Sequence, residues 1–567
     1  MMLRPILNTV AAAALTALIV SPALADGNAG AYLSARQASL ANDYETAAQS
    51  YTRALLRDPA NLELIENAMT AYVSLGDLDR ALPLARRMAE LGPRSQLASL
   101  VLFADMAERG SWNEVLTGLD EGETVGPLYD GLLRAWALVG LGRMGDALDQ
   151  FQAVEDARGT QAFGLYHRAL ALASVGDFEG AHAIFSGENG PRIRLTARGI
   201  AAHAQVLGQL ERGKEGAAAI TAAFGADPDP FMVELRDRLL AGEDVPFTIV
   251  NSPQDGVAEM HFSISNALNG EASDSYTLIY SRLATHLRPD HMQSLLLTAG
   301  LLERLERFEL ATEVYDKVPV DHPYFHAAEL GRAEALKALG REEAAIEVLT
   351  QLGKTHANLP IVHVTLGDTY RRLERYAEAT APYDRAIELI GEPQPRHWML
   401  FFSRGITHER EDRWPQAEAD FRRALELQPD QPQVLNYLGY SFVEMQTNLD
   451  EALNMIERAV EGQPNSGYIT DSLGWVLYRL GRYQEAVVHM ERAVELLPID
   501  PIINDHLGDV YWAVGRQREA EFQWHRALSF DPEPEDAERI RRKLEVGLDT
   551  VLAEEGAPPL QVANEDG

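Results

Sequence analysis

A repeat of 34 residues near the C-terminal end restricts the fold of this chain more than any other feature of its sequence. It runs from Gly467 to Pro532, as GYITDSLGWVLYRLGRYQEAVVHMERAVELLP and then IDPIINDHLGDVYWAVGRQREAEFQWHRALSFDP. The aligned residues are Leu473 with Leu507, Gly474 with Gly508, Gly481 with Gly515, Ala486 with Ala520, Ala493 with Ala527 and Pro498 with Pro532. This period, with its large and small apolar positions, is typical of helical hairpins that bury their apolar faces against neighbouring hairpins.

Weaker copies of this repeat fill most of the chain. Clear units precede the strong pair and carry the equivalent glycines Gly367, Gly405 and Gly439. Residues 96–230 keep the spacing but lose most of the characteristic residues. We therefore predict an all-α fold, a right-handed α-solenoid of about fourteen helical hairpins in two lobes.

The domain boundaries follow from the places where the helical period stops. Residues 244–256 have no helical period, two prolines and a short β-branched run, which together predict an extended linker. The hairpins of 28–243 then form an N-terminal lobe, and those of 257–534 form a C-terminal lobe. We expect a polar helix over 535–554 to cap the last hairpin. The acidic tail, 555–567, is expected to be disordered.

Glycine inside a helix indicates where the two helices of a hairpin cross closely. Gly474 costs about 1 kcal/mol relative to Ala in a helix interior, so another backbone is expected to pass too close for a side chain. Ala486 and Ala493 offer a small opposing surface, and Met490 is expected to fill the space beside them. One inserted residue lengthens the preceding unit, and we place it at the turn 446–448.

The first 25 residues have the pattern of an export signal. Arg4 precedes an apolar run over 6–20, and the small residues Ala23 and Ala25 fit a signal-peptidase site. A membrane anchor is the alternative, but about 15 apolar residues are fewer than the roughly 20 that span a bilayer. We predict a signal peptide over 1–25 and no transmembrane segment after its cleavage.

The chain contains no cysteine, which excludes disulfides, thiolate metal sites and a lipid-modified N-terminal cysteine. An exported protein of this length without disulfides is more typical of the bacterial periplasm than of eukaryotic secretion. The predicted location is therefore periplasmic.

Acidic residues strongly outnumber basic ones. Without the signal, the 50 Lys and Arg fall to 49 and face 85 Asp and Glu, a net charge of −36. Such a surface repels phosphate backbones and anionic lipid headgroups, so nucleic acid is not an expected partner. Basic proteins are favoured as partners, and an acidic surface that only maintains solubility is the alternative.

The repeated residues Leu473, Gly474, Ala486, Ala493 and Pro498 match the tetratricopeptide repeat pattern, and this resemblance covers most of residues 28–534. The runs NYLGYSF, GYITDSLGWVLYRLGRY and HLGDVYWAVGR resemble a bacterial envelope family of these repeats. That family includes an outer-membrane lipoprotein that binds a carboxyl-terminal processing protease and helps it degrade peptidoglycan hydrolases. This chain departs from it in lacking the lipid-bearing cysteine.

The resemblance implies a non-enzymatic periplasmic scaffold or adaptor with a protein or peptide partner. A carboxyl-terminal processing protease or a cell-wall enzyme is the partner that it suggests, because one scaffold that holds enzyme and substrate raises their effective concentration. A structural subunit of an envelope secretion or polysaccharide-export complex is the alternative function.

In such solenoids the first helix of each hairpin lines the concave face, with positions 2, 5, 9 and 12 pointing inward. The aromatic, Asn and Asp residues at these positions suit a polypeptide ligand that carries basic residues. Packing between hairpins is the alternative role for each aromatic residue. The candidate protein-binding residues are Asn436, Tyr440, Tyr468, Asp471, Trp475, Tyr478, Asp505, Asp509 and Trp512.

Motifs for catalysis or cofactor binding are incomplete. Residues 140–145 satisfy GxGxxG, but they follow a helix rather than a strand and fall at a repeat turn. Residues 208–214 satisfy GxxxxGK, but no strand precedes them and Glu215 stands where the motif needs Ser or Thr. His322 and His326 are four residues apart with Pro323 between them, which favours the start of a helix over a zinc site. We assign no catalytic residue, cofactor or metal to the sequence, and we predict that the protein is not an enzyme.

Overall fold

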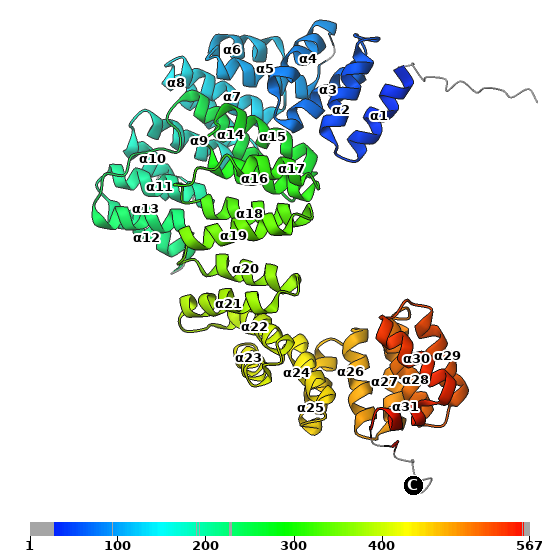
Figure 1. Cartoon of the computed structure of the whole chain (residues 1–567). Helices are drawn as coiled ribbons and strands as arrows, with labels where there is room; N and C mark the ends of the chain where they lie inside the picture. Colours follow the sequence, from blue (N-terminus) through cyan, green and yellow to red (C-terminus); the bar gives the residue numbers. More distant parts are fainter. Residues whose placement is uncertain are drawn as a thin grey trace, which may run out of the picture. The chain divides into compact units, whose positions relative to one another are not determined.

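A computed structural model of the chain describes residues 28–557, apart from 93, 189, 192 and 226–228, together with 559–560. All regular secondary structure in this part of the chain is helical, which confirms the all-α prediction (Figure 1). The chain divides into two compact units, Met1–Val348 and Leu349–Gly567, called unit 1 and unit 2 below. The predicted signal peptide lies outside the described residues. No helix among those described has both the length and the hydrophobicity needed to cross a bilayer.

Unit 1 begins with six helical hairpins followed by one further helix. These helices are α1 Asn28–Leu40, α2 Tyr44–Leu55, α3 Leu62–Leu75, α4 Leu78–Leu91, α5 Gln96–Glu108, α6 Trp112–Glu121, α7 Pro127–Gly140, α8 Met144–Asp156, α9 Gln161–Ser174, α10 Phe178–Ser186, α11 Ala197–Gln209, α12 Gly213–Phe224 and α13 Pro230–Ala241. The turn between α3 and α4 shows how the sequence ends one helix and starts the next. Gly76 takes a left-handed conformation, and the carboxylate of Asp77 accepts a hydrogen bond from the N–H of Arg80 at 3.1 Å.

Six more helices complete unit 1, and the first two of them pack against the first helices of the earlier hairpins (Figure 1). They are α14 Pro253–Leu268, α15 Asp274–Leu287, α16 Met292–Arg304, α17 Phe308–Tyr315, α18 Phe325–Ala338 and α19 Glu342–Thr355, and α19 spans the boundary between the units. α14 contacts α7 and α9, and α15 contacts α3 and α5. A side chain at Gly256 would clash with the ring of Trp136, so α14 lies directly against α7.

The segment 244–256 is not the boundary between two lobes. Its non-helical part ends where α14 begins at Pro253, and Val245, Ile249 and Val250 are buried in the core of unit 1. Gln205 of α11 exchanges two hydrogen bonds of 3.0 Å with Thr248, which satisfies polar groups of this extended stretch. The β-branched run that we interpreted as a linker is therefore packed structure, and the division between units falls at 348/349 instead.

Unit 2 contains five further hairpins and two C-terminal helices. They are α20 Pro360–Arg372, α21 Tyr376–Ile390, α22 Trp398–Arg410, α23 Trp414–Leu427, α24 Pro432–Glu444, α25 Leu449–Gly462, α26 Gly467–Arg479, α27 Tyr483–Leu496, α28 Pro501–Ala513, α29 Gln517–Leu528, α30 Pro534–Val546 and α31 Leu548–Glu554, with a 3-10 turn at Pro395–His397. With α13, α30 and α31 set aside, the described helices of the whole chain pair into fourteen hairpins. Gly140–Gly145 lies at a hairpin turn, as predicted, and Gly208–Lys214 also lies at one.

The small residues lie where the sequence predicted close crossings. The nearest group at Gly474 is the side chain of Met490 rather than the backbone that we predicted, and a side chain at Gly474 would clash with it. A side chain at the equivalent Gly508 would clash with the ring of Trp524. The inserted residue lies at the turn between α24 and α25, where Gln446 and Asn448 both take left-handed backbone conformations.

The C-terminal cap consists of two helices rather than the single helix predicted over 535–554. Gly547 separates α30 from α31 with a φ of +81°, and a Cβ there would lie 2.7 Å from the ring of Trp512. The chain then turns back onto unit 2, where Ala557 and Leu560 pack against its core. Ala557 and Leu560 of the predicted tail are thus packed, and residues 558 and 561–567 lie outside the described residues.

Candidate functional site

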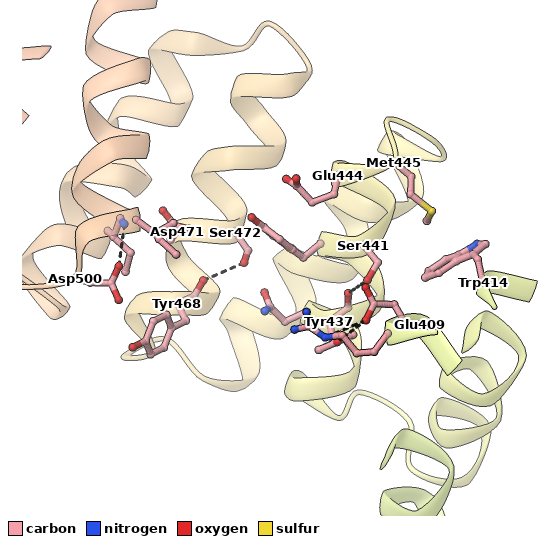
Figure 2. Close-up of a pocket in the computed structure, with 15 residues that line it drawn as sticks. Glu409, Trp414, Tyr437, Ser441, Glu444, Met445, Tyr468, Asp471, Ser472 and Asp500 are labelled. Atoms are coloured by element: carbon pink, nitrogen blue, oxygen red, sulfur yellow. Dashed lines mark hydrogen bonds and ion pairs between the residues drawn. The ribbon is translucent and has the colours of Figure 1, made fainter. Parts of the chain in front are cut away.

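A pocket of ≈ 470 Å³ lies on the surface that α20, α22, α24, α26 and α28 form, called the first-helix face of unit 2 below. Four successive hairpins contribute to it (Figure 2). Its lining residues are Glu409 and Arg410 of α22; Trp414 of α23; Asn436, Tyr437, Tyr440, Ser441 and Glu444 of α24, with Met445 directly after it; Tyr468, Asp471 and Ser472 of α26; and Asp500, Ile502 and Ile503 at the start of α28.

The two ends of the pocket differ in chemistry. Figure 2 shows Trp414 and Met445 at one end and Asp471 and Asp500 at the other. Tyr468 is 61% exposed, and Ile502 is 49% exposed, so large apolar groups remain in solvent at the acidic end. Solvent-exposed apolar side chains beside a pocket are typical of binding surfaces for polypeptides.

Carboxylates dominate the charged groups that line the pocket. Four of them, Glu409, Glu444, Asp471 and Asp500, face one guanidinium, that of Arg410. Hydrogen bonds hold two of these carboxylates in place: Tyr437 Oη donates to Glu409 at 3.1 Å, and Trp475 Nε1 donates to Glu444 at 3.0 Å. Burial and the nearby Glu409 raise the pKa of Tyr437 to about 12, so its hydroxyl stays protonated and keeps donating.

Four of the nine residues predicted from the sequence line this pocket, namely Asn436, Tyr440, Tyr468 and Asp471. Burial, together with Glu444, raises the pKa of Tyr440 far above its ordinary value. The Oδ1 of Asn436 is buried and has no hydrogen-bond partner within the described chain. Buried acceptors are nearly always paired in folded proteins, so this amide oxygen is an exception.

Two other predicted residues, Trp475 and Tyr478, are buried in a stack of rings instead of facing a free surface. The ring of Trp475 lies 4.8 Å from that of Tyr478 and 3.9 Å from that of His506, both nearly parallel to it. His506 Nδ1 lies 3.1 Å from both oxygens of Asp471. Burial opposes the charged imidazolium, but Asp471 outweighs it and raises the pKa of His506. These side chains therefore support the wall of the pocket.

The last three predicted residues, Asp505, Asp509 and Trp512, are covered by the C-terminal helices. Lys543 of α30 donates to Asp505 at 2.7 Å and to Asp509 at 2.7 Å, and its side chain is fully buried. Trp512 Nε1 donates to Asp549 of α31 at 2.8 Å. The physical reason for the difference from the prediction is that α30 and α31 pack on the inward positions of α28, which repeat numbering alone treats as free.

The sequence analysis missed the α22 side of the pocket. Glu409 occupies position 12 of α22, so the same numbering applied one hairpin earlier would have found it. Trp414 and Met445 lie at helix ends, and no inward-position rule identifies them.

Unit 1 contains a buried polar cluster with a superficial likeness to a hydrolase triad. Glu259 Oε2 accepts from Arg198 Nε at 2.7 Å and lies 3.1 Å from His291 Nε2, while Ser294 Oγ lies 2.9 Å from His291 Nδ1. The side chains of Glu259, His291 and Ser294 are all buried, and the N–H of Ser294 donates to His291 Nδ1 as a helix cap. A small cavity of ≈ 150 Å³ reaches Glu259 but not His291 or Ser294, so the cluster holds α14 in place and offers no nucleophile to a substrate. The described residues contain no group of three or more His, Asp or Glu arranged to hold a metal ion.

Two family descriptions of the tetratricopeptide repeat match unit 2. One matches residues 364–432 and 402–466, and the other matches residues 471–500. These residues therefore contain tetratricopeptide repeats. The TPR repeat-containing protein PA4667 of Pseudomonas aeruginosa is 37% identical to this chain over 59 residues, which are 10% of each protein.

Several solved structures resemble this chain over long stretches at low sequence identity. One is a chain from the crystal structure of the APC/C hetero-tetramer Cut9-Hcn1. The match covers 92% of this chain and 97% of that chain, at 14% sequence identity and a TM-score of 0.37. The match to yeast Tom70 covers 93% of this chain and 98% of the Tom70 chain, at 15% sequence identity and a TM-score of 0.33. YrrB, described as a TPR protein with an unusual peptide-binding site, covers 35% and 99% at 19% identity and a TM-score of 0.29. Likeness at this level carries no conclusion about function.

Proposed function

We propose that this protein is a non-enzymatic adaptor that binds a polypeptide segment on the first-helix face of unit 2. The observation that supports this most is the ≈ 470 Å³ pocket, which four successive hairpins build and which leaves Tyr468 and Ile502 in solvent. Rigid aromatic and aliphatic groups beside fixed polar groups match the way proteins recognise peptide segments. The tetratricopeptide repeats within residues 364–500 are in accord with a role in protein–protein interaction.

The proposed setting is the periplasm of a bacterium. The export-signal pattern of residues 1–25 and the absence of cysteine support this location. Osmotic-shock fractionation of cells that express the full chain tests it, because release of the protein with the periplasmic fraction is expected. Retention in the cytoplasm after shock would contradict the proposed location.

The proposed partner is a processing protease or a cell-wall enzyme, together with its substrate. A scaffold that binds both would raise the concentration of one near the other without any catalytic residue of its own. Pull-down from envelope extract with the full-length protein, followed by peptide identification, should recover such an enzyme. Purified protein should show no peptidase or glycosidase turnover.

A pair of double variants makes the pull-down specific for the pocket. Tyr468→Ser with Ile502→Ser removes the exposed apolar groups beside the pocket and should abolish recovery of the partner. Val488→Ser with Phe522→Ser removes equally exposed apolar groups from α27 and α29 outside the pocket and should leave recovery unchanged. Equal recovery by both double variants would refute binding at this face.

A further inference from the structure

The fifth residues of α24, α26 and α28 form a row of hydrogen-bond acceptors on the first-helix face of unit 2. They are Asn436, Asp471 and Asp505, which the repeat relates by 34 residues and by one inserted residue. Two members of this row are paired with a basic side chain that comes from the helix two places further along the chain. Lys543 of α30 donates to Asp505, and His506 of α28 pairs with Asp471.

Asn436 of α24 differs from the other two, because α26, the first helix of the next hairpin, supplies no donor to its Oδ1. The residue of α26 equivalent to His506 is Ser472, and its hydroxyl donates instead to the carbonyl of Tyr468 at 3.0 Å. Asn436 Oδ1 is therefore left buried and unpaired at the wall of the pocket. The row thus has one acceptor without a donor among the described residues, and it belongs to Asn436, which lines the pocket.

The surroundings of this acceptor favour a cation. Glu409, Glu444 and Asp471 line the same pocket. Arg410 lies 3.5 Å from Glu409 and His506 lies 3.1 Å from Asp471, so among the described residues Glu444 is the carboxylate of the three that has no basic partner. In a partly desolvated site, an ammonium or guanidinium that hydrogen-bonds to such oxygens is bound more strongly than a neutral donor. An anionic side chain would be repelled there.

We propose that Asn436 and the neighbouring carboxylates form a subsite for one lysine or arginine side chain of the bound polypeptide. This inference rests on the proposed function and adds the chemistry of the partner. The protein shows the same recognition internally, where the ammonium of Lys543 lies within 2.7–2.9 Å of the carboxylates of Asp505 and Asp509. The partner segment would place its basic residue next to apolar residues that contact Tyr468 and Ile502.

The experiment is selection from a random library of displayed 12-residue peptides on the immobilised full-length protein. We expect Lys or Arg to be enriched at one position of the selected peptides, with apolar residues beside it. The consensus peptide, labelled with fluorescein, should bind Asn436→Leu about tenfold more weakly than wild type, the factor that one hydrogen bond to a charged group supplies. Asn454→Leu, an exposed position on α25, is the matched control and should bind as wild type does.

A second variant separates recognition from folding. Asn436→Asp places a carboxylate in the position where Asp471 and Asp505 carry theirs, and it should bind the basic consensus peptide several-fold more tightly. A gain in affinity cannot come from misfolding. The thermal midpoint of Asn436→Leu should equal or exceed that of wild type, because the substitution removes a buried unpaired acceptor.

The outcomes distinguish this inference from the function on which it rests. Selected peptides without a basic residue, or equal binding by wild type, Asn436→Leu and Asn436→Asp, would overturn the cation subsite. The proposed function would survive that result if Tyr468→Ser with Ile502→Ser still abolished peptide binding. If the library yielded no peptide that wild type binds better than this double variant, both proposals would fall.

Discussion

The two units use the inner surface of their hairpins in different ways. In unit 1, α14 and α15 fill the surface of α3, α5, α7 and α9, and buried contacts such as Tyr166 to Glu259 at 2.8 Å hold them there. In unit 2, α30 and α31 cover only the end at α28, and the pocket over α22, α24 and α26 stays open. Hairpin stacking alone therefore does not leave an inner surface free. The surface stays free only where other helices of the chain do not cover it.

Acid should have the largest effect on the difference between the units, because it should destabilise unit 1, whose filled inner surface contains buried neutral histidines. Burial lowers the pKa of His167, His261 and His291 to about 4. The unfolded chain binds these protons near pH 6.5, so the stability of unit 1 should fall as pH falls from about 6.5 towards 4. The expected loss between pH 7 and pH 5 is on the order of 2 kcal/mol for each histidine.

Unit 2 should respond to pH in the opposite direction at His506. Its pKa is raised by Asp471, so its stabilising contribution is complete below the unfolded value and is lost as pH rises through the folded value. Hydrogen exchange with mass spectrometry should show α14 opening at pH 5, whereas α26 and α28 should open more readily at alkaline pH. His506→Gln should remove the alkaline change and leave the acid change of α14 intact. Equal acid response of both regions would contradict this account.

Removal of the cation that neutralises Glu259 should be the next largest effect. Arg198→Ala leaves a fully buried carboxylate without its guanidinium and should lower the free energy of unfolding by about 3–5 kcal/mol. Urea denaturation measures this loss. Arg194→Ala, at an exposed neighbouring position, should change it by less than about 0.5 kcal/mol. A small effect of Arg198→Ala would mean that the α14 contacts are not needed to keep unit 1 filled.

Overpacking within a hairpin of unit 2 should have a smaller effect. Gly474→Leu forces a side chain onto Met490 and should cost about 1–3 kcal/mol. Gly300→Leu is the matched control, because Gly300 lies inside α16 with no atom near the added Cβ. This control should be neutral or stabilising, since leucine is a better helix former than glycine. Equal thermal midpoints for Gly474→Leu and wild type would refute the crossing that the repeat predicts.

The sequence predicted the local architecture well, because its determinants are local. The close crossing at Gly474 and the inserted residue at Gln446–Asn448 both follow from a period of one hairpin. The same period predicted that Asn436, Tyr440, Tyr468 and Asp471 share a surface, and the structure brings them together at one pocket.

Long-range packing was outside the reach of the sequence pattern. The run Val245–Val250 has the composition of an extended linker, and only its contacts with α11 and with the core of unit 1 show that it is buried. Likewise, the pattern of the polar helix predicted over 535–554 did not indicate that Lys543 would be buried and would donate to the carboxylates of Asp505 and Asp509. In both cases the decisive contact joins residues tens of positions apart that no repeat relates.

Thiol accessibility tests most directly whether the inner surface of unit 1 is filled while that of unit 2 is open. Because the chain has no native cysteine, any reaction with a thiol reagent reports the introduced cysteine alone. Single substitutions Ile502→Cys, beside the open pocket, and Ala258→Cys, on α14, report the two surfaces. We expect a maleimide to react with Ile502→Cys in the folded full-length protein at nearly the rate of an unstructured thiol. It should react with Ala258→Cys only after unfolding. Comparable rapid reaction at both positions, or protection at Ile502→Cys without any ligand, would contradict the account.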